Sequence, residues 1–344
     1  MSAVEPAARI GEVLDRRTMR AMVQERYGAA SEVLQFRDVP IPEIGSSEVL
    51  VRVHSSSVNA MEWHLMNGKP YVFRAVFGFR PKQPTLGADV AGTVVATGDN
   101  VTRFRVGDEV LGEIVAGAYA EFARARDDHL VNKPANVSFE EAAAVGVAGL
   151  TALQGLRDEL AVGPGQKVLI IGGSGGVGTY AIQVAKFLGA EVTAVCSTRN
   201  VDQARELGAD HVVDYQKEDI TLTAERFDAI FDIPGNLTLR SCKRLMAHGG
   251  VYAMVGGAKG SWTGPLFRMI RAMFLFAFGD KRNTTFTATS RADDLATLAE
   301  LLSSGQIRSV IEDTYPLAEI AGLIDRQGRF HARAKTVIKV EGTV

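Results

Sequence analysis

The chain has 344 residues, of which 46% are hydrophobic and 23% charged, and its formal net charge is −2 at pH 7. These values are typical of a globular protein, and the length exceeds what one hydrophobic core usually serves, so we expect two domains. The near-neutral charge argues against a nucleic-acid partner or an anionic membrane surface. Two cysteines, Cys196 and Cys242, allow one disulfide but no disulfide framework, which makes a reducing cytoplasm the simplest expected location.

The first 18 residues lack the apolar stretch of a secretory signal. They also carry Glu5, Glu12 and Asp15, whereas transit peptides are poor in acidic residues. We therefore interpret residues 1–18 as an N-terminal extension ahead of a domain that starts near Met19.

The first third of the chain is rich in predicted β-strands. Apolar, β-branched runs occur at residues 49–54 and 90–96, and a shorter one starts at Val110. Turn signals separate them at Gly98-Asp99-Asn100 and Gly107-Asp108. Many short strands punctuated by glycine predict a distorted barrel.

From about Ser138 the pattern changes to an alternation of helices and strands. We expect helical segments at 140–147, 149–160, 178–188 and 201–207, and strands at 168–171, 191–195, 211–213, 229–231 and 250–255. This alternation predicts an α/β domain, with a parallel sheet that carries helices on both faces.

Toward the C-terminus, residues 266–278 are strongly apolar but contain Arg268 and Arg271. The segment is shorter than the roughly 20 residues that a spanning helix needs. We expect a buried or lid-forming helix, with an interfacial membrane segment as the alternative. An amphipathic helix at 293–302 and a closing strand at 336–340 follow.

The strand at 168–171 runs into a glycine-rich turn and then a helix. Gly173, Gly175 and Gly178 form the pattern Gly-x-Gly-x-x-Gly. In a dinucleotide-binding turn these glycines permit a tight turn, close approach of backbone N–H groups to phosphate, and close helix–strand packing. We therefore predict a pyrophosphate site here, which also includes Ser174, Gly176 and Val177.

The end of the next predicted strand indicates which dinucleotide is bound. A carboxylate at this point favours NAD because it bonds the ribose hydroxyls. Here Val195 is followed by Cys196, Ser197, Thr198 and Arg199, and no carboxylate occurs before Asp202. Two hydroxyls and a guanidinium suit a 2′-phosphate, so we predict that the cofactor is NADPH.

Several further motifs occur together with the glycine turn. They are Leu86-Gly87-Ala88-Asp89-Val90-Ala91-Gly92, Phe104-Arg105-Val106-Gly107-Asp108-Glu109-Val110, Gly117-Ala118-Tyr119-Ala120-Glu121 and Leu207-Gly208-Ala209-Asp210-His211-Val212-Val213-Asp214-Tyr215. With them the chain resembles the medium-chain dehydrogenase/reductase superfamily, specifically its zinc-free quinone oxidoreductase (zeta-crystallin-like) branch. The resemblance implies a GroES-like β-barrel domain (19–140 and 286–344) and a Rossmann domain (141–285), with the active site between them.

The resemblance also assigns candidate site residues. Asn59 and Gly87-Ala88-Asp89 stand where zinc-dependent relatives carry a cysteine and a Gly-His-Glu segment, so neither a thiol nor an imidazole is available and no metal is expected. Tyr215 stands near the expected 2′-phosphate, and Lys335 stands where the family often keeps a cofactor-side lysine. Val255, Gly256 and Gly257 would border the nicotinamide.

Without a metal, the expected reaction is hydride transfer to a lipophilic quinone or α,β-unsaturated carbonyl, in which charge develops on a distant oxygen. His64 could stabilise that charge or pass a proton, or it could be a loop histidine without a catalytic part. Asn59 could bond the substrate or hold its loop. A metal-free alcohol or aldehyde reductase and a non-catalytic NADPH-binding protein remain alternatives. We also expect a homodimer.

Overall fold

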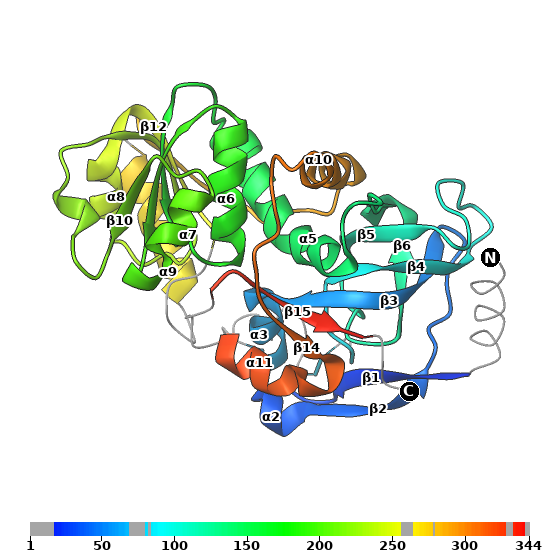
Figure 1. Cartoon of the computed structure of the whole chain (residues 1–344). Helices are drawn as coiled ribbons and strands as arrows, with labels where there is room; N and C mark the ends of the chain where they lie inside the picture. The colour runs from blue at the N-terminus through cyan, green and yellow to red at the C-terminus, as the bar shows by residue number, and fades with distance from the viewer. Residues whose placement is uncertain are drawn as a thin grey trace.

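The computed structural model describes residues 17–68, 80–81, 84–255, 264–277, 279–327 and 333–340. Two large sheets form two lobes, with the long helix α5 (Phe139–Gln154) between them (Figure 1). One lobe, green to yellow in the figure, contains a six-stranded sheet, and the other contains a seven-stranded sheet. The first lobe has the α/β fold that the alternating pattern predicts, and the second has the GroES-like fold that the resemblance implies. The exact domain boundaries stay predictions.

All neighbouring strands of the six-stranded sheet are parallel, and their order is β10-β9-β8-β11-β12-β13. This is the order of a doubly wound dinucleotide-binding fold. The strands are β8 (Lys167–Ile171), β9 (Glu191–Cys196), β10 (His211–Asp214), β11 (Phe227–Asp232), β12 (Met246–Met254) and β13 (Arg282–Thr285). The sequence did not predict β13, which is short and polar.

Helices cover both faces of this sheet, as the alternating pattern predicts. One face packs on α5, α6 (Gly176–Phe187) and α7 (Val201–Glu206), through a core that includes Ile170, Tyr180 and Ala204. The other face packs on α8 (Leu239–Leu245) and α9 (Gly264–Phe276), where Ile230, Leu245 and Phe276 are buried. Cys242 is fully buried in this second core.

The seven-stranded sheet has the order β14-β15-β3-β4-β5-β7, and β6 pairs with β3. Only β14 and β15 are parallel, and the other pairs are antiparallel. The strands are β3 (Glu48–Val58), β4 (Asp89–Thr97), β5 (Glu109–Glu113), β6 (Phe122–Arg126), β7 (Leu130–Asn132), β14 (Ile311–Pro316) and β15 (Lys335–Lys339), and β1 (Thr18–Gln24) and β2 (Leu34–Pro40) form a separate ribbon. Shorter helices beside this sheet are α2 (Ala30–Val33), α3 (Ala60–Asn67) and α11 (Ile320–Gln327).

Helix α5 differs from the sequence-based expectation of two helical segments. It is one helix, continued by a π-helical turn at Gly155–Glu159. Ser138 caps it by accepting a bond from the Glu141 backbone, and the Glu141 carboxylate accepts from the Ser138 backbone in return. Gly149 does not break the helix. A Cβ there would lie 2.7 Å from the Val145 side chain and 3.1 Å from Leu298 of α10 (Ala292–Ser303), so the glycine permits close packing instead.

The apolar segment near residue 270 forms α9, a helix that is only partly buried. Ala272 and Phe276 are buried against the sheet, whereas Met273 is 66% and Phe274 71% exposed. Phe278 lies outside the described residues. None of the helices in the described part of the chain combines the length and apolar character needed to cross a lipid bilayer.

We expect Gly178→Ala to destabilise the parallel-sheet domain, because the new Cβ would lie 2.1 Å from the carbonyl oxygen of Gly172. Overpacking against backbone costs about 3 kcal/mol, which should lower the melting temperature Tm by about 5 °C or more in a thermal unfolding scan. Gly163→Ala is the control, since no atom lies within 4 Å of its Cβ. Equal Tm values for the two variants would contradict the packing described here.

Candidate active site between the two sheets

The glycine turn connects β8 to α6, and its three glycines meet different surroundings. Gly173 faces Ala194 and Ile182, with 3.1 and 3.2 Å available to a Cβ, and Gly178 lies directly against the Gly172 carbonyl. Gly175 is open, since the nearest atom to its Cβ position is 3.6 Å away. The outer two glycines thus allow the turn to pack, while the middle one leaves the backbone accessible at the start of α6. Unpaired N–H groups at a helix start bind anions.

The strand that closes the other sheet contacts this turn. The Ala334 backbone N–H donates to the Ser174 carbonyl at 2.7 Å, and Ala334 forms a β-bridge with Gly175. The next residue, Lys335, begins β15, and its Cδ lies 2.9 Å from the Cβ position of Gly176. The lysine side chain therefore lies against the cofactor turn predicted from the sequence.

The Lys335 ammonium is buried, with only 2% of the residue exposed. Its Nζ donates to Asn59 Oδ1 at 2.5 Å and to Asp89 Oδ2 at 3.2 Å. Asp89 is itself fully buried at the start of β4. A buried charge is tolerated only when it is paired and hydrogen-bonded, and this pair meets both conditions.

Both oxygens of Asp89 have partners from other elements. Oδ1 accepts the Val147 backbone N–H of α5 at 2.6 Å, and Oδ2 accepts from the Ser57 hydroxyl and from Asn59 Nδ2. A Cβ on Gly146 would lie 2.4 Å from Oδ1. The glycine therefore lets α5 approach the carboxylate closely.

Asn59 precedes α3, and its side-chain amide is engaged within the protein. The oxygen accepts from Lys335, while Nδ2 donates to Asp89 at 2.9 Å and to Glu62 Oε1 at 3.3 Å. Glu62 Oε2 accepts the Asn59 backbone N–H at 2.9 Å. Of the two roles considered for Asn59, these bonds favour holding the loop over bonding a substrate.

The sequence patterns did not single out Glu62. In the structure this residue is only 1% exposed. Burial is the main reason that its pKa is raised to about 7, and the nearby Asp89 charge adds to the effect. His64 lies further along α3 and is partly buried. Its ring packs edge-on against Trp63 with 5.0 Å between centroids.

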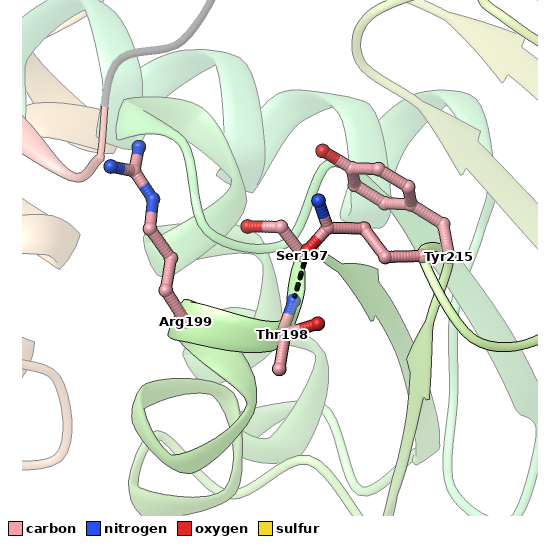
Figure 2. Close-up of a pocket in the computed structure, with 5 residues that line it drawn as sticks. Ser197, Thr198, Arg199 and Tyr215 are labelled. Atoms are coloured by element: carbon pink, nitrogen blue, oxygen red, sulfur yellow. Dashed lines mark hydrogen bonds between the residues drawn. The ribbon is translucent and has the colours of Figure 1, made fainter.

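A pocket of about 480 Å³ lies where β9 and β10 end, and Figure 2 shows its lining. The lining residues are Ser197, Thr198, Arg199, Tyr215 and Gln216. The structure thus brings together the four residues predicted for the 2′-phosphate. The sequence missed Gln216, whose side-chain oxygen accepts the Thr198 backbone N–H at 3.2 Å.

Parallel pairing explains why this pocket forms. Asp214 pairs with Cys196 in the sheet, so the two strands end side by side. The Asp214 carboxylate is buried beneath the pocket and accepts the Thr198 hydroxyl at 2.6 Å and the Gln216 backbone N–H at 3.1 Å. These hydrogen bonds lower the pKa of Asp214, the Thr198 bond most strongly. Asp214 thus brings a carboxylate close to this pocket, but its hydrogen bonds to Thr198 and Gln216 hold the loop.

The remaining predicted cofactor residues follow β12. Val255 is partly exposed, and its backbone N–H donates to the Asp232 carbonyl at 3.1 Å. Gly256 and Gly257 lie outside the described residues. Phe286, which follows β13, stacks on Phe231 at 6.4 Å between ring centroids.

The residues at the expected zinc positions do not suit zinc. Asn59 offers an amide oxygen and Asp89 a carboxylate, and both already accept from Lys335. Within the described ranges, no group of three or more His, Cys, Asp or Glu side chains is arranged to hold a metal ion. A bound cation would have to displace the ammonium.

Known proteins match both lobes. Residues 45–135 match the alcohol dehydrogenase GroES-like domain, and residues 176–304 match the zinc-binding dehydrogenase family. A solved quinone oxidoreductase from Coxiella burnetii is 29% identical, with a TM-score of 0.83, over 94% of this chain and 100% of that one.

Two curated relatives match along most of their length. "Quinone-oxidoreductase QR1, chloroplastic" of Triphysaria versicolor is 33% identical over 93% of this chain and 98% of its own. "NADPH-dependent alkenal/one oxidoreductase, chloroplastic" of Arabidopsis thaliana is 30% identical over 93% and 79%. The chain therefore belongs to the quinone oxidoreductase branch of the medium-chain dehydrogenase/reductase superfamily, whose members are oxidoreductases that use the nicotinamide cofactors NAD(P)H.

Proposed function

We propose that this protein is an NADPH-dependent, metal-independent reductase that transfers hydride to quinones or α,β-unsaturated carbonyls. The observation that carries the proposal is the pocket formed by Ser197, Thr198, Arg199 and Tyr215 beside the glycine turn. The names of two relatives, a quinone oxidoreductase and an NADPH-dependent alkenal/one oxidoreductase, agree with it.

Each part of the cofactor has a complementary group in this proposal. The start of α6 and the open backbone at Gly175 would receive the pyrophosphate. The Arg199 guanidinium would hold the 2′-phosphate through two parallel charge-assisted bonds, with the Ser197 hydroxyl donating from the loop. The Lys335 side chain lies against Gly176 and would support the turn that receives the phosphates. Val255, Gly256 and Gly257 would border the nicotinamide, which supplies the hydride.

The protein's own task would be to orient the acceptor and to stabilise the charge that develops on its oxygen. His64 would donate a hydrogen bond to that oxygen. Asn59 would hold the loop before α3, since its amide bonds Lys335, Asp89 and Glu62. The buried Lys335–Asp89 pair would hold the loop before α3 and the start of β15 in place without a metal ion.

Two other functions need direct comparison with this one. A metal-free alcohol or aldehyde reductase would use the same cofactor site but would reduce an isolated carbonyl. A non-catalytic protein would bind NADPH without turnover. We also keep a cytoplasmic location and a homodimer as predictions, the second to be tested by sedimentation of the purified chain.

The first experiment follows NADPH oxidation against matched sets of quinones, enones and saturated aldehydes. We expect turnover with lipophilic quinones or enones and none with saturated aldehydes. Turnover with aldehydes alone would favour the alcohol or aldehyde reductase. A stoichiometric NADPH complex without turnover on any set would favour a binding protein.

Arg199→Ala should weaken NADPH binding by about 10- to 100-fold, because a charge-assisted hydrogen bond contributes about 1.5–3 kcal/mol. NADH binding should change little, since NADH has no 2′-phosphate. Arg205→Ala is the matched control, as Arg205 is exposed and pairs with Asp202 at 3.3 Å. Titration calorimetry gives all affinities, and a tenfold preference of the wild type for NADH would refute the cofactor assignment.

Prolonged dialysis against a strong chelator should leave turnover unchanged, because Lys335 already donates to the two residues that would otherwise meet a metal. A zinc-dependent alcohol dehydrogenase treated in parallel should lose its activity. Loss of turnover that added Zn²⁺ restores would show that the metal-independent part of the proposal is wrong.

A further inference from the structure

Glu113 lies at the end of β5, directly opposite Asp89 in the β4–β5 ladder. Side chains of directly opposed residues point to the same face of a sheet. Glu113 is therefore on the face where Asp89 binds Lys335, and Lys335 in turn lies against the glycine turn. The register therefore places this carboxyl group on the same face of the sheet as the Lys335–Asp89 pair.

The environment of Glu113 differs from that of the other two acids nearby. Asp89 is paired with Lys335, and both oxygens of Glu62 accept backbone or side-chain N–H groups. Glu113 Oε2 is buried and has no hydrogen-bond partner among the residues that the structure describes. An ionised carboxylate in such a place is unfavourable, so the neutral acid is the stable form.

The surrounding charges reinforce this conclusion. Asp89 from β4, Glu62 from α3 and Lys335 from β15 face the group, and three carboxyl groups share one cation. Burial is the largest cause that raises the pKa of Glu113, the charges of Asp89 and Glu62 raise it further, and Lys335 lowers it, with a result of about 8. Glu113 therefore carries a proton at neutral pH.

Glu113 also adjoins the segment that crosses from one lobe to the other. The Ser290 hydroxyl, located between β13 and α10, donates to the Glu113 backbone carbonyl at 3.0 Å. The residue itself is only partly buried, so its proton can be replaced from solvent. The acid thus lies where the two lobes meet, close to the turn predicted to hold the cofactor.

We propose that Glu113 is the acid that supplies the proton in the reduction. The inference rests on the proposed function. When hydride adds to the β-carbon of the acceptor, its C=C electron pair shifts and negative charge moves to the carbonyl oxygen. The Glu113 O–H bond then breaks, and the proton forms a new O–H bond on that oxygen. The acceptor would gain one hydride, which carries two electrons, and one proton, the bound reduced nicotinamide would supply the hydride, and solvent would reprotonate the carboxylate.

The test compares Glu113→Gln with Glu109→Gln, a control on the same strand. Glu109 is half-exposed and pairs with Lys133 at 3.0 Å, while Lys133 keeps bonds to two carbonyls. Glu113→Gln should lower kcat by about 100-fold, with little change in KM, because an amide cannot release a proton under these conditions. Glu109→Gln should retain wild-type kcat.

The pH profile separates a proton donor from a structural residue. Only the protonated acid is active, so wild-type kcat should be level below about pH 8 and fall above it. Glu113→Gln should lose this limb and show a flat, low rate. Glu113→Asp, which keeps a carboxyl group, should recover part of the rate together with the limb, and it serves as a second variant if the amide does not fold.

A measurement without cofactor or substrate tests the same carboxyl group. Infrared difference spectra of the unliganded enzyme should contain the carbonyl stretch of a protonated carboxyl that titrates near pH 8. The band should be absent in Glu113→Gln and present in Glu109→Gln. The Glu62 carboxyl, whose pKa is about 7, gives a separate band that both variants retain.

The outcomes distinguish the two proposals. No wild-type turnover on quinones or enones would refute the proposed function, whatever the infrared spectra show. Normal wild-type turnover with an unchanged kcat and pH profile in Glu113→Gln would refute the role of Glu113 alone. In that case a large loss in His64→Gln would identify His64 as the proton source.

Discussion

The buried ion pair between Lys335 and Asp89 is the interaction on which the rest of the candidate site depends. Four parts of the chain meet at it, because β15 supplies the ammonium, β4 the carboxylate, the loop before α3 the Asn59 amide, and α5 the Val147 N–H. Neither charge is tolerable in this interior without the other. The same lysine also lies against Gly176. One ion pair therefore holds β15 in the seven-stranded sheet and also positions the cofactor turn.

Local patterns account for the parts of the molecule that the sequence could predict. The glycine turn and the Ser197–Arg199 loop are short segments whose chemistry follows from their own residues and from the strand before each. Tyr215 was added by resemblance, and the parallel pairing of β9 and β10 brings it to the loop. In contrast, the segments expected at 140–147 and 149–160 are one helix with a π-helical turn at its end, and Gly149 within it packs on Leu298, which is remote in sequence.

The acidic cluster could not be predicted from the sequence for the same reason. Glu62, Asp89 and Glu113 lie on three different elements, and no spacing or composition connects them. Their proximity depends on the β4–β5 register and on where α3 begins. A single-residue shift in that register would move Glu113 to the opposite face of the sheet. The shifted pKa values of these carboxyl groups therefore depend on tertiary contacts. Such shifted pKa values cluster at functional sites.

Ala334 has a left-handed backbone conformation, with φ at 53°. For a residue with a Cβ this costs about 1–2 kcal/mol, and here its N–H is held by the Ser174 carbonyl in the cofactor turn. The contact between the lobes thus contains a backbone conformation that is unfavourable for an alanine by itself. The cost of the Ala334 conformation therefore offsets part of what this hydrogen bond contributes. The joint between the lobes is consequently less stable than its hydrogen bonds alone imply.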